Sequence, residues 1–104
     1  MERIKLNIDV VNAESFYLRF TGFMFKEEAG YALFFKNCRS IHTFFMRFDL
    51  DIIYLDKYNK VIKIIKQLKP FKIALPVKGT VSIMEIPSNM INNIEFLFSK
   101  FIDF

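Results

Sequence analysis

The stretch of residues 41–56 holds the side chains best suited to chemistry. It contains His42, the single histidine of the chain, and then Asp49 and Asp51. A histidine and carboxylates can transfer protons or bind a metal ion. In a strand, the two aspartates would share one face about 6.6 Å apart along the chain. An enzyme using Asp51 and His42 is therefore one hypothesis, although hydrogen bonds to local amides at the entrance of a strand explain the same residues.

A second reactive residue, Cys38, lies four positions before His42. On a helix the two side chains would be neighbours, whereas in a strand they stand about 13 Å apart. Residues 36–40 contain no glycine and predict no helix start from which an oxyanion hole could be built. A single cysteine also excludes an internal disulfide and a cysteine-rich metal site. The sequence thus shows no complete catalytic set, and we expect no metal and no cofactor.

Aromatic residues are interleaved with the polar ones in this stretch. The chain has 14 phenylalanines, more than a domain of this size hides easily, so part of the aromatic surface is expected to face a ligand or a partner. We therefore predict a non-enzymatic binding or interaction domain with an aromatic-lined groove around residues 41–54. Its ligand would be a small anionic molecule or a peptide, and the predicted contacts are His42, Thr43, Arg47 and Asp51.

Charge suggests another kind of site. Residues 57–78 contain seven lysines and no acidic residue, so this basic segment carries +7 within a net charge of +4. Such segments attract nucleic acid or phosphorylated ligands, and Tyr58 and Phe71 lie among the lysines as stacking platforms would. Nucleic-acid binding is therefore an alternative function, with an anion site formed by Lys60, Lys63, Lys66 and Lys69. Lysines that protect an edge strand explain the same pattern.

Length and composition limit the class of protein. A chain of 104 residues fits one domain, residues 1–104, and 53% hydrophobic with 25% charged residues is typical of a globular chain. No apolar run approaches the roughly 18 residues of a membrane-spanning helix, and the N-terminus lacks the apolar region of a signal peptide. We expect a soluble, cytoplasmic protein.

The elements that must position these residues are mostly strands. Alternation predicts a half-buried strand over residues 3–11, with Ile4, Leu6, Ile8 and Val10 on one face. The spacing of Phe16, Phe20 and Phe23 predicts a short helix capped by Asn12 and ending near Gly22. Further strands are expected at residues 31–35, 52–55 and 81–86, the last ending at Pro87.

Two structures fit residues 60–68. The apolar spacing matches an amphipathic helix, but the β-branched residues and a hairpin-like link at Asn59 favour a strand. Residues 69–80, which contain two prolines, are expected to be irregular. Ser88 would cap a second short helix over residues 90–95, and residues 96–104 would form a last strand or pack as a terminus. These elements predict an α+β fold that is mainly β: a small antiparallel barrel-like or curled sheet with one or two short helices.

Several segments together resemble one family. The block His-Thr-Phe-Phe-Met-Arg-Phe at residues 42–48, with the aliphatic run ending at Asp56, resembles the signature of the prokaryotic family catalogued as domain of unknown function 192. Gly-Phe-Met at 22–24, Gly-Tyr-Ala-Leu-Phe at 30–34, Leu-Lys-Pro-Phe-Lys at 68–72 and Met-Glu-Ile-Pro at 84–87 resemble further family segments in the same order, over about residues 16–88. The chain departs from the family at Asp49, where members have proline, at Asn59 and Asn89, where they have glycine, and in its tail. The resemblance implies a compact β-rich domain with a short helix near its start, and no known reaction.

Overall fold

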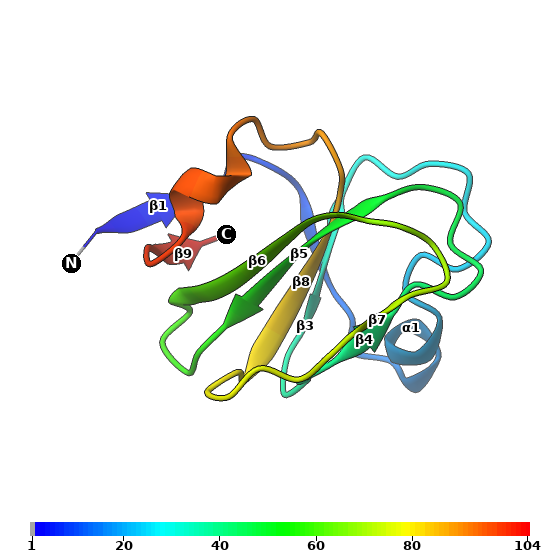
Figure 1. Ribbon diagram of the computed structural model, residues 1–104, viewed down its shortest axis with the longest axis horizontal. Helices are drawn as coiled ribbons and strands as arrows, with labels where there is room; N and C mark the ends of the chain where they lie inside the picture. Colours follow the sequence, from blue (N-terminus) through cyan, green and yellow to red (C-terminus); the bar gives the residue numbers. More distant parts are fainter. Residues whose placement is uncertain (1) are drawn as a thin grey trace.

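The computed structural model describes residues 2–104, without the side chain of Phe16. Its main element is a five-stranded sheet with the order β2-β3-β8-β5-β6 (Figure 1). These strands are Val10–Asn12, Ala32–Phe35, Ser82–Pro87, Leu50–Leu55 and Val61–Leu68. β2 and β3 are parallel, and the other neighbours are antiparallel. The long hairpin β5–β6 and the strand β8 thus form the centre of the domain.

Two small sheets lie at opposite ends of the large one (Figure 1). β1 (Arg3–Lys5) pairs in parallel with β9 (Phe101–Asp103) and joins the two ends of the chain. β4 (Ile41–His42) pairs with β7 (Ile73–Ala74) at the other end, where the helix α1 (Phe16–Thr21) also lies. A 3-10 turn, η1 (Ile94–Leu97), precedes β9. No helix among residues 2–104 is long and apolar enough to span a membrane.

The large sheet is open, so the prediction of a barrel-like or curled sheet is wrong. Its edges are β2 and β6, which do not pair with each other. β2 is three residues long, and the start of β6 is covered by the C-terminal segment, with Val61 N donating to Lys100 O at 2.8 Å. The short β2 at one edge and the covered start of β6 at the other are consistent with the open sheet. The coarser prediction, a mainly β fold with one short helix, is confirmed.

Core residues lie on both faces of the large sheet. Every residue of β5 and β8 is buried, because these central strands are packed on each side. Ile53 and Met84, which face each other across the two strands, belong to one hydrophobic cluster. Ile52 and Ile83 belong to the other. The alternation of side chains along β5 and β8 therefore assigns every residue of these strands to one of two faces.

Most predicted strands are confirmed. β3, β5, β6 and β8 form where they were expected, and Asn59 adopts the left-handed conformation that the β5–β6 hairpin needs, with φ 64°. The predicted strand over residues 3–11 is wrong in one respect, because it divides into β1 and β2, which join different sheets. Its predicted face is confirmed: Leu6 is buried, and Ile4, Ile8 and Val10 pack against the same cluster.

The helix boundaries need correction. α1 is capped by Ser15, whose Oγ accepts from Leu18 N at 3.0 Å, because Asn12 is still part of β2. The helix ends at Gly22 as predicted. The helix expected over residues 90–95 does not form, since Asn89 and Asn93 adopt left-handed backbone angles that interrupt it. Residues 69–80 contain the short strand β7, and the tail forms β9.

Candidate functional site

Six aromatic rings form a continuous series at the end of the molecule that carries α1, β4 and β7. We call this series the aromatic row. Its successive ring centroids are 5.0–6.5 Å apart, in the order Phe20, His42, Phe44, Phe71, Phe45 and Phe25. The exposed fractions of its phenylalanines, in that order, are 64%, 37%, 60%, 50% and 61%. Rings exposed in series mark an interaction surface more strongly than single exposed apolar residues do.

Three phenylalanines of the row have an unusual backbone. Phe25, Phe45 and Phe71 have φ values of 65°, 62° and 63°, a left-handed conformation that is costly for bulky residues. Their rings nevertheless pack on one another, with Phe45 between the other two. Among the described residues, all the aromatic residues with positive φ thus belong to the row.

Thr43 holds the two loops of the row together. Its side chain is fully buried, and its Oγ1 donates to Lys69 O at 2.7 Å and accepts from Lys72 N at 2.9 Å. Its backbone carbonyl also accepts from Phe71 N at 2.9 Å. Thr43, predicted as a ligand contact, is therefore turned inward and fixes Phe71 beside residues 44 and 45.

His42 and Arg47 lie on the same loop but have different surroundings. The half-buried His42 accepts from Phe44 N through Nδ1 at 3.1 Å, so the neutral ring carries its proton on Nε2. Its ring also stacks on Phe44. Arg47 is exposed and forms an ion pair with Glu27. His42 is therefore part of the aromatic row, while the Arg47 guanidinium is engaged beside it.

Asp51 lies away from His42. Its buried Oδ1 accepts from Gln67 N and from Ser88 Oγ, both at 2.9 Å. Asp51 faces Ile86 across β5 and β8, whereas Glu85 faces Ile52, so the Asp51 and Glu85 side chains point to opposite faces of the sheet. His42 lines a cavity on the Glu85 side. The structure therefore does not bring Asp51 and His42 together.

A small cavity lies beside the row, between α1, β4 and β8. It has a volume of about 80 Å³ and is lined by Phe20, Gly22, Phe35, Cys38, Ser40, His42, Met46 and Glu85, among others. We call it the Glu85 cavity. Glu85 is 2% exposed, and its Oε1 has no hydrogen-bond partner. Burial raises the pKa of this carboxyl group from 4.5 to about 8, so the group is mostly neutral at pH 7.

Cys38 and His42 both line this cavity, but they do not form a reactive dyad. The Cys38 thiol donates to Ser40 O at 3.1 Å. Burial raises the pKa of the thiol above its ordinary value, which suppresses the nucleophilic thiolate. The arrangement therefore offers binding groups rather than an activated nucleophile.

Sequence reasoning missed two exposed rings of the row, Phe20 and Phe25, and the buried carboxyl group, and it placed Phe71 only in the basic segment. Phe20, Phe25 and Phe71 lie outside residues 41–54, and only the fold brings them to His42. Glu85 did have a signal, because it shares the alternating face of β8 with Ile83, a core residue. A carboxyl group at a core position of a strand is rare unless it has a role or a partner.

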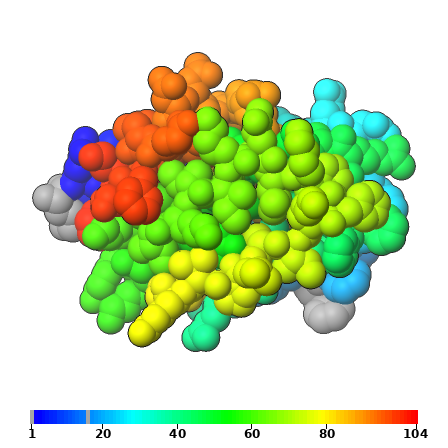
Figure 2. All heavy atoms as spheres, in the orientation of Figure 1, coloured from blue at the N-terminus to red at the C-terminus, as the bar shows by residue number. Residues whose placement is uncertain are grey.

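Two of the four lysines of the predicted anion site form ion pairs with acidic side chains, and exposed Lys63 lies with them on β6 or next to it. Lys66 pairs with Glu95, and Lys69 Nζ lies 2.7 Å from Asp49 Oδ2. Lys60 Nζ lies 5.9 Å from the centroid of the Phe101 ring. The basic segment runs across the face seen in Figure 2, coloured green to yellow, and includes the edge strand β6. Lysines on an edge strand can protect it from pairing with a strand of another molecule, and the position of the basic segment agrees with this role.

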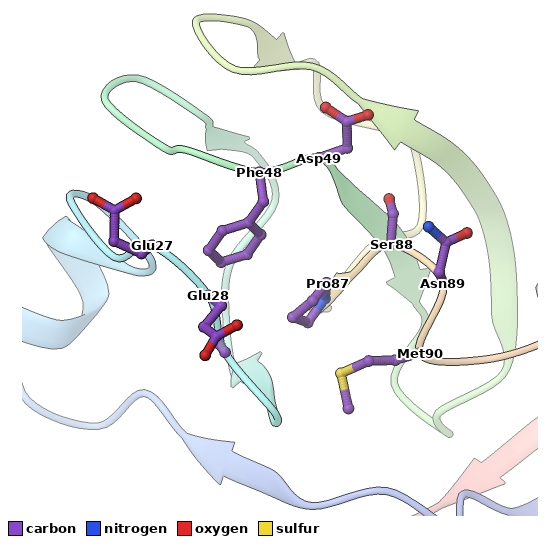
Figure 3. Close-up of a pocket in the computed structure, with 9 residues that line it drawn as sticks. Glu27, Glu28, Phe48, Asp49, Pro87, Ser88, Asn89 and Met90 are labelled. Carbon is purple, nitrogen blue, oxygen red and sulfur yellow. The ribbon is translucent and has the colours of Figure 1, made fainter.

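A larger and shallower hollow, of about 350 Å³, lies near Phe48 and Pro87. Figure 3 shows the Phe48 ring pointing toward Pro87, while the carboxylate of Asp49 points away. Two of its acidic residues are already paired: Glu27 with Arg47 and Asp49 with Lys69. The hollow therefore lacks the unpaired buried group that distinguishes the Glu85 cavity.

Known proteins resemble this chain in sequence and in fold. The model of the family DUF192, described as "Uncharacterized ACR", matches residues 1–97. The chain belongs to the DUF192 family. This confirms the resemblance found in the sequence, and the Glu85 cavity of this DUF192 chain is lined by Gly22, His42, Met46 and Glu85 from three of the segments that carry it.

Relatives of this DUF192 chain are themselves uncharacterised. It is 34% identical over 86 residues to a UPF0127 protein of Thermococcus sibiricus, covering 77% of this chain and 55% of that protein. It is 36% identical over 89 residues to a UPF0127 protein of Pyrococcus horikoshii, covering 80% and 76%. The chain thus spans about half the length of the first of these relatives. A crystal structure of a protein of unknown function from Novosphingobium aromaticivorans shares the fold, with a TM-score of 0.68, 22% identity, and coverage of 85% of this chain and 66% of that chain.

Proposed function

We propose that this DUF192 chain is a non-enzymatic binding domain that recognises a polypeptide segment with apolar side chains through the aromatic row. The observation that supports this most is the strained, exposed trio Phe25, Phe45 and Phe71. Strain in the backbone persists where the surrounding fold imposes it, and it is frequent at binding sites. Here it exposes rings that would contribute more stability if they were buried.

The surroundings of the row suit a peptide better than a small polar ligand. Exposed Ile73 and Leu75 follow Phe71 in the chain, and Ile73 pairs with His42 across β4 and β7. They extend the apolar surface beyond the rings. The Arg47–Glu27 ion pair and His42 supply a polar rim, as in interfaces where aromatic anchors lie within polar borders.

The test is a peptide selection followed by affinity measurement. Peptides selected from a random library on the immobilised chain are expected to contain apolar residues. Fluorescence anisotropy should show that Phe71→Ala weakens their binding by about tenfold or more. Phe96→Ala is the matched control, because Phe96 is also half-exposed (51%) but lies in η1, outside the row. Equal affinity of the wild type and the Phe71→Ala variant would contradict the proposal.

Single-stranded nucleic acid is a second candidate, favoured by the position of Phe71 between Lys69 and Lys72 in a segment without acids. Exposed rings between cations stack with bases. Its test is a titration with a labelled oligonucleotide at several salt concentrations, where log affinity should fall linearly with log salt. Charge reversal at Lys63 and Lys72 should weaken such binding further. Absence of binding at low salt would exclude this candidate.

A further inference from the structure

The Glu85 cavity has the properties of a ligand site separate from the aromatic row. It is a partly open hollow lined by residues of α1, β4, β8 and neighbouring segments, and Glu85, the one carboxyl group among its described lining residues, is 2% exposed and has an unpartnered oxygen. From this geometry we infer that the cavity binds a small ammonium group, either the ammonium ion or the protonated amine of a short alkylamine. The inference does not depend on what binds the aromatic row.

Among residues 2–104, no cation is paired with Glu85. Arg19 also lines the cavity, but its Nη1 donates to Lys36 O at 2.8 Å and its Nη2 to Asn37 O at 3.3 Å. Burial alone accounts for the raised pKa of Glu85, with no contribution from the Arg19 charge. The guanidinium is thus held at the loop of residues 36–37, and the carboxyl group is left for another donor.

The remaining wall is mainly apolar but offers a few acceptors. Thr21 Oγ1 donates to Tyr17 O at 2.9 Å, and the Cys38 thiol donates to Ser40 O, so both present lone pairs to any third group. Met46 and Phe35 approach the same point, since their Cε and Cζ atoms would lie 3.5 and 3.7 Å from a Cβ at position 22. Thioether sulfur is a weak acceptor, and aromatic rings attract cations.

The size of the cavity and the charge of Glu85 limit which hydrogen-bond donors can bind. A volume of about 80 Å³ exceeds the roughly 10–15 Å³ that one water molecule needs, so the cavity has room for a small ligand. Carboxylate ligands would bring a second negative group against Glu85, which like charges at short range disfavour. An ammonium group supplies hydrogen-bond donors for the unpartnered Oε1 of Glu85 and a positive charge that pairs with the carboxylate.

Binding is coupled to a proton. The neutral carboxylic acid of Glu85 must lose its proton to solvent for the carboxylate to pair with the ammonium group, which keeps its own proton. Affinity is therefore expected to rise with pH up to about 8 and then to level off, because an alkylammonium group stays protonated to about pH 10. The other titratable groups facing the cavity are Arg19, Cys38 and His42, so a comparison with Glu85→Gln at each pH isolates the contribution of Glu85.

The experiment is an NMR titration of the ¹⁵N-labelled full chain with methylammonium chloride. At about pH 9 we expect saturable shifts of the Gly22, Cys38 and His42 amides, and at about pH 6 an affinity at least tenfold lower. Two salts at equal ionic strength serve as controls. Sodium acetate tests whether an anion binds instead, and tetramethylammonium chloride tests a bulkier cation that donates no hydrogen bond. An ammonium chloride series distinguishes the bare ion from the alkylamine.

Two variants complete the test. Glu85→Gln should lose the saturable shifts, and Gly30→Ala, which does not line the cavity and has open space for its added methyl group, should keep them. Saturation with acetate instead, or an unchanged titration in Glu85→Gln, would overturn the inference. If Glu85→Gln does not fold, the pH dependence of the wild-type titration decides: equal affinity for methylammonium at the two pH values would equally overturn it.

Discussion

Gly22 leaves room for Glu85: a Cβ at position 22 would lie 3.1 Å from Glu85 Oε1. Gly22 also has φ 50° at the end of α1, a conformation that L side chains rarely adopt. This close approach joins the helix to β8, so the glycine serves both the turn and the packing of the carboxyl group.

The first prediction concerns this close approach. Gly22→Ala should lower the free energy of unfolding by about 1–3 kcal/mol, because the methyl group adds backbone strain and crowds Glu85. Gly30→Ala is the matched control, since nothing lies within 4 Å of its added Cβ, and should change stability by less than about 0.5 kcal/mol. Urea denaturation measures both. Equal stability of the two variants would show that the approach is not tight.

The second prediction is a pH dependence of stability set by Glu85. Its pKa rises from 4.5 in the unfolded chain to about 8 in the folded protein. Between these values the folded protein keeps a proton that the unfolded chain has lost, so the free energy of unfolding falls as pH rises through this window. The stabilisation is fully present below about pH 4.5 and is lost above about pH 8.

Glu85→Gln removes this ionisation. Relative to the wild type, the variant should therefore gain stability from about pH 5 to about pH 9, by on the order of 4 kcal/mol at most, since one pKa unit is about 1.4 kcal/mol. Guanidinium denaturation at several pH values gives the two profiles. Other titrating groups contribute to both proteins alike, so parallel profiles would mean that the Glu85 pKa is not raised.

Local patterns predicted the strands but not how they assemble. Alternation identified the buried face of residues 3–11 correctly, because the period of side chains depends on neighbours in sequence. It could not reveal that Ile4 and Val10 belong to different sheets, since β1 pairs with a strand almost a hundred residues away. The predicted barrel was wrong for the same reason: closure depends on what covers β6, which is the distant segment around Lys100.

Residue type alone marks some members of the candidate site in the sequence. His42 stands out as the single histidine, and it does lie in both the row and the cavity wall. Thr43 and Asp51 also stand out by type, but their oxygens bond to the protein itself, which no pattern of neighbours reveals. Phe25 does not stand out in the sequence, and Phe71 stands out only as a ring among lysines, because the loop contacts to Phe45 and Thr43 that bring both rings into the row join distant segments.

The third prediction tests the role of Thr43. Thr43→Val keeps the shape but removes the hydroxyl that bonds to Lys69 O and Lys72 N, leaving two backbone groups without that partner. We expect a loss of about 1–3 kcal/mol, with increased amide hydrogen exchange in residues 69–72. Thr43→Ser retains the hydroxyl and should restore most of the loss. A Val variant as stable as the Ser variant would show that the hydroxyl does not hold the loops.

The fourth prediction separates Asp51 from the proposed sites. Asp51→Ala should cost about 2 kcal/mol, because Gln67 N and Ser88 Oγ lose an acceptor. Asp51→Asn keeps Oδ1 and should stay within about 1 kcal/mol of the wild type. Since Asp51 lies on the face of the sheet opposite Glu85, the methylammonium titration of the Asn variant should match that of the wild type. A loss of the titration in this variant would contradict the assignment of faces.

The fifth prediction uses the backbone at Phe71. With φ 63°, this position favours glycine over any residue with a Cβ, and both Phe71→Gly and Phe71→Ala remove the same ring. The Gly variant should therefore be more stable than the Ala variant by about 1 kcal/mol, the reverse of the usual order. Exposed Phe96, which lies in η1 outside the left-handed positions, provides the control, and there Ala should be the more stable. If Ala is more stable at both positions, Phe71 is not strained, and the main support for the aromatic row as a binding surface is lost.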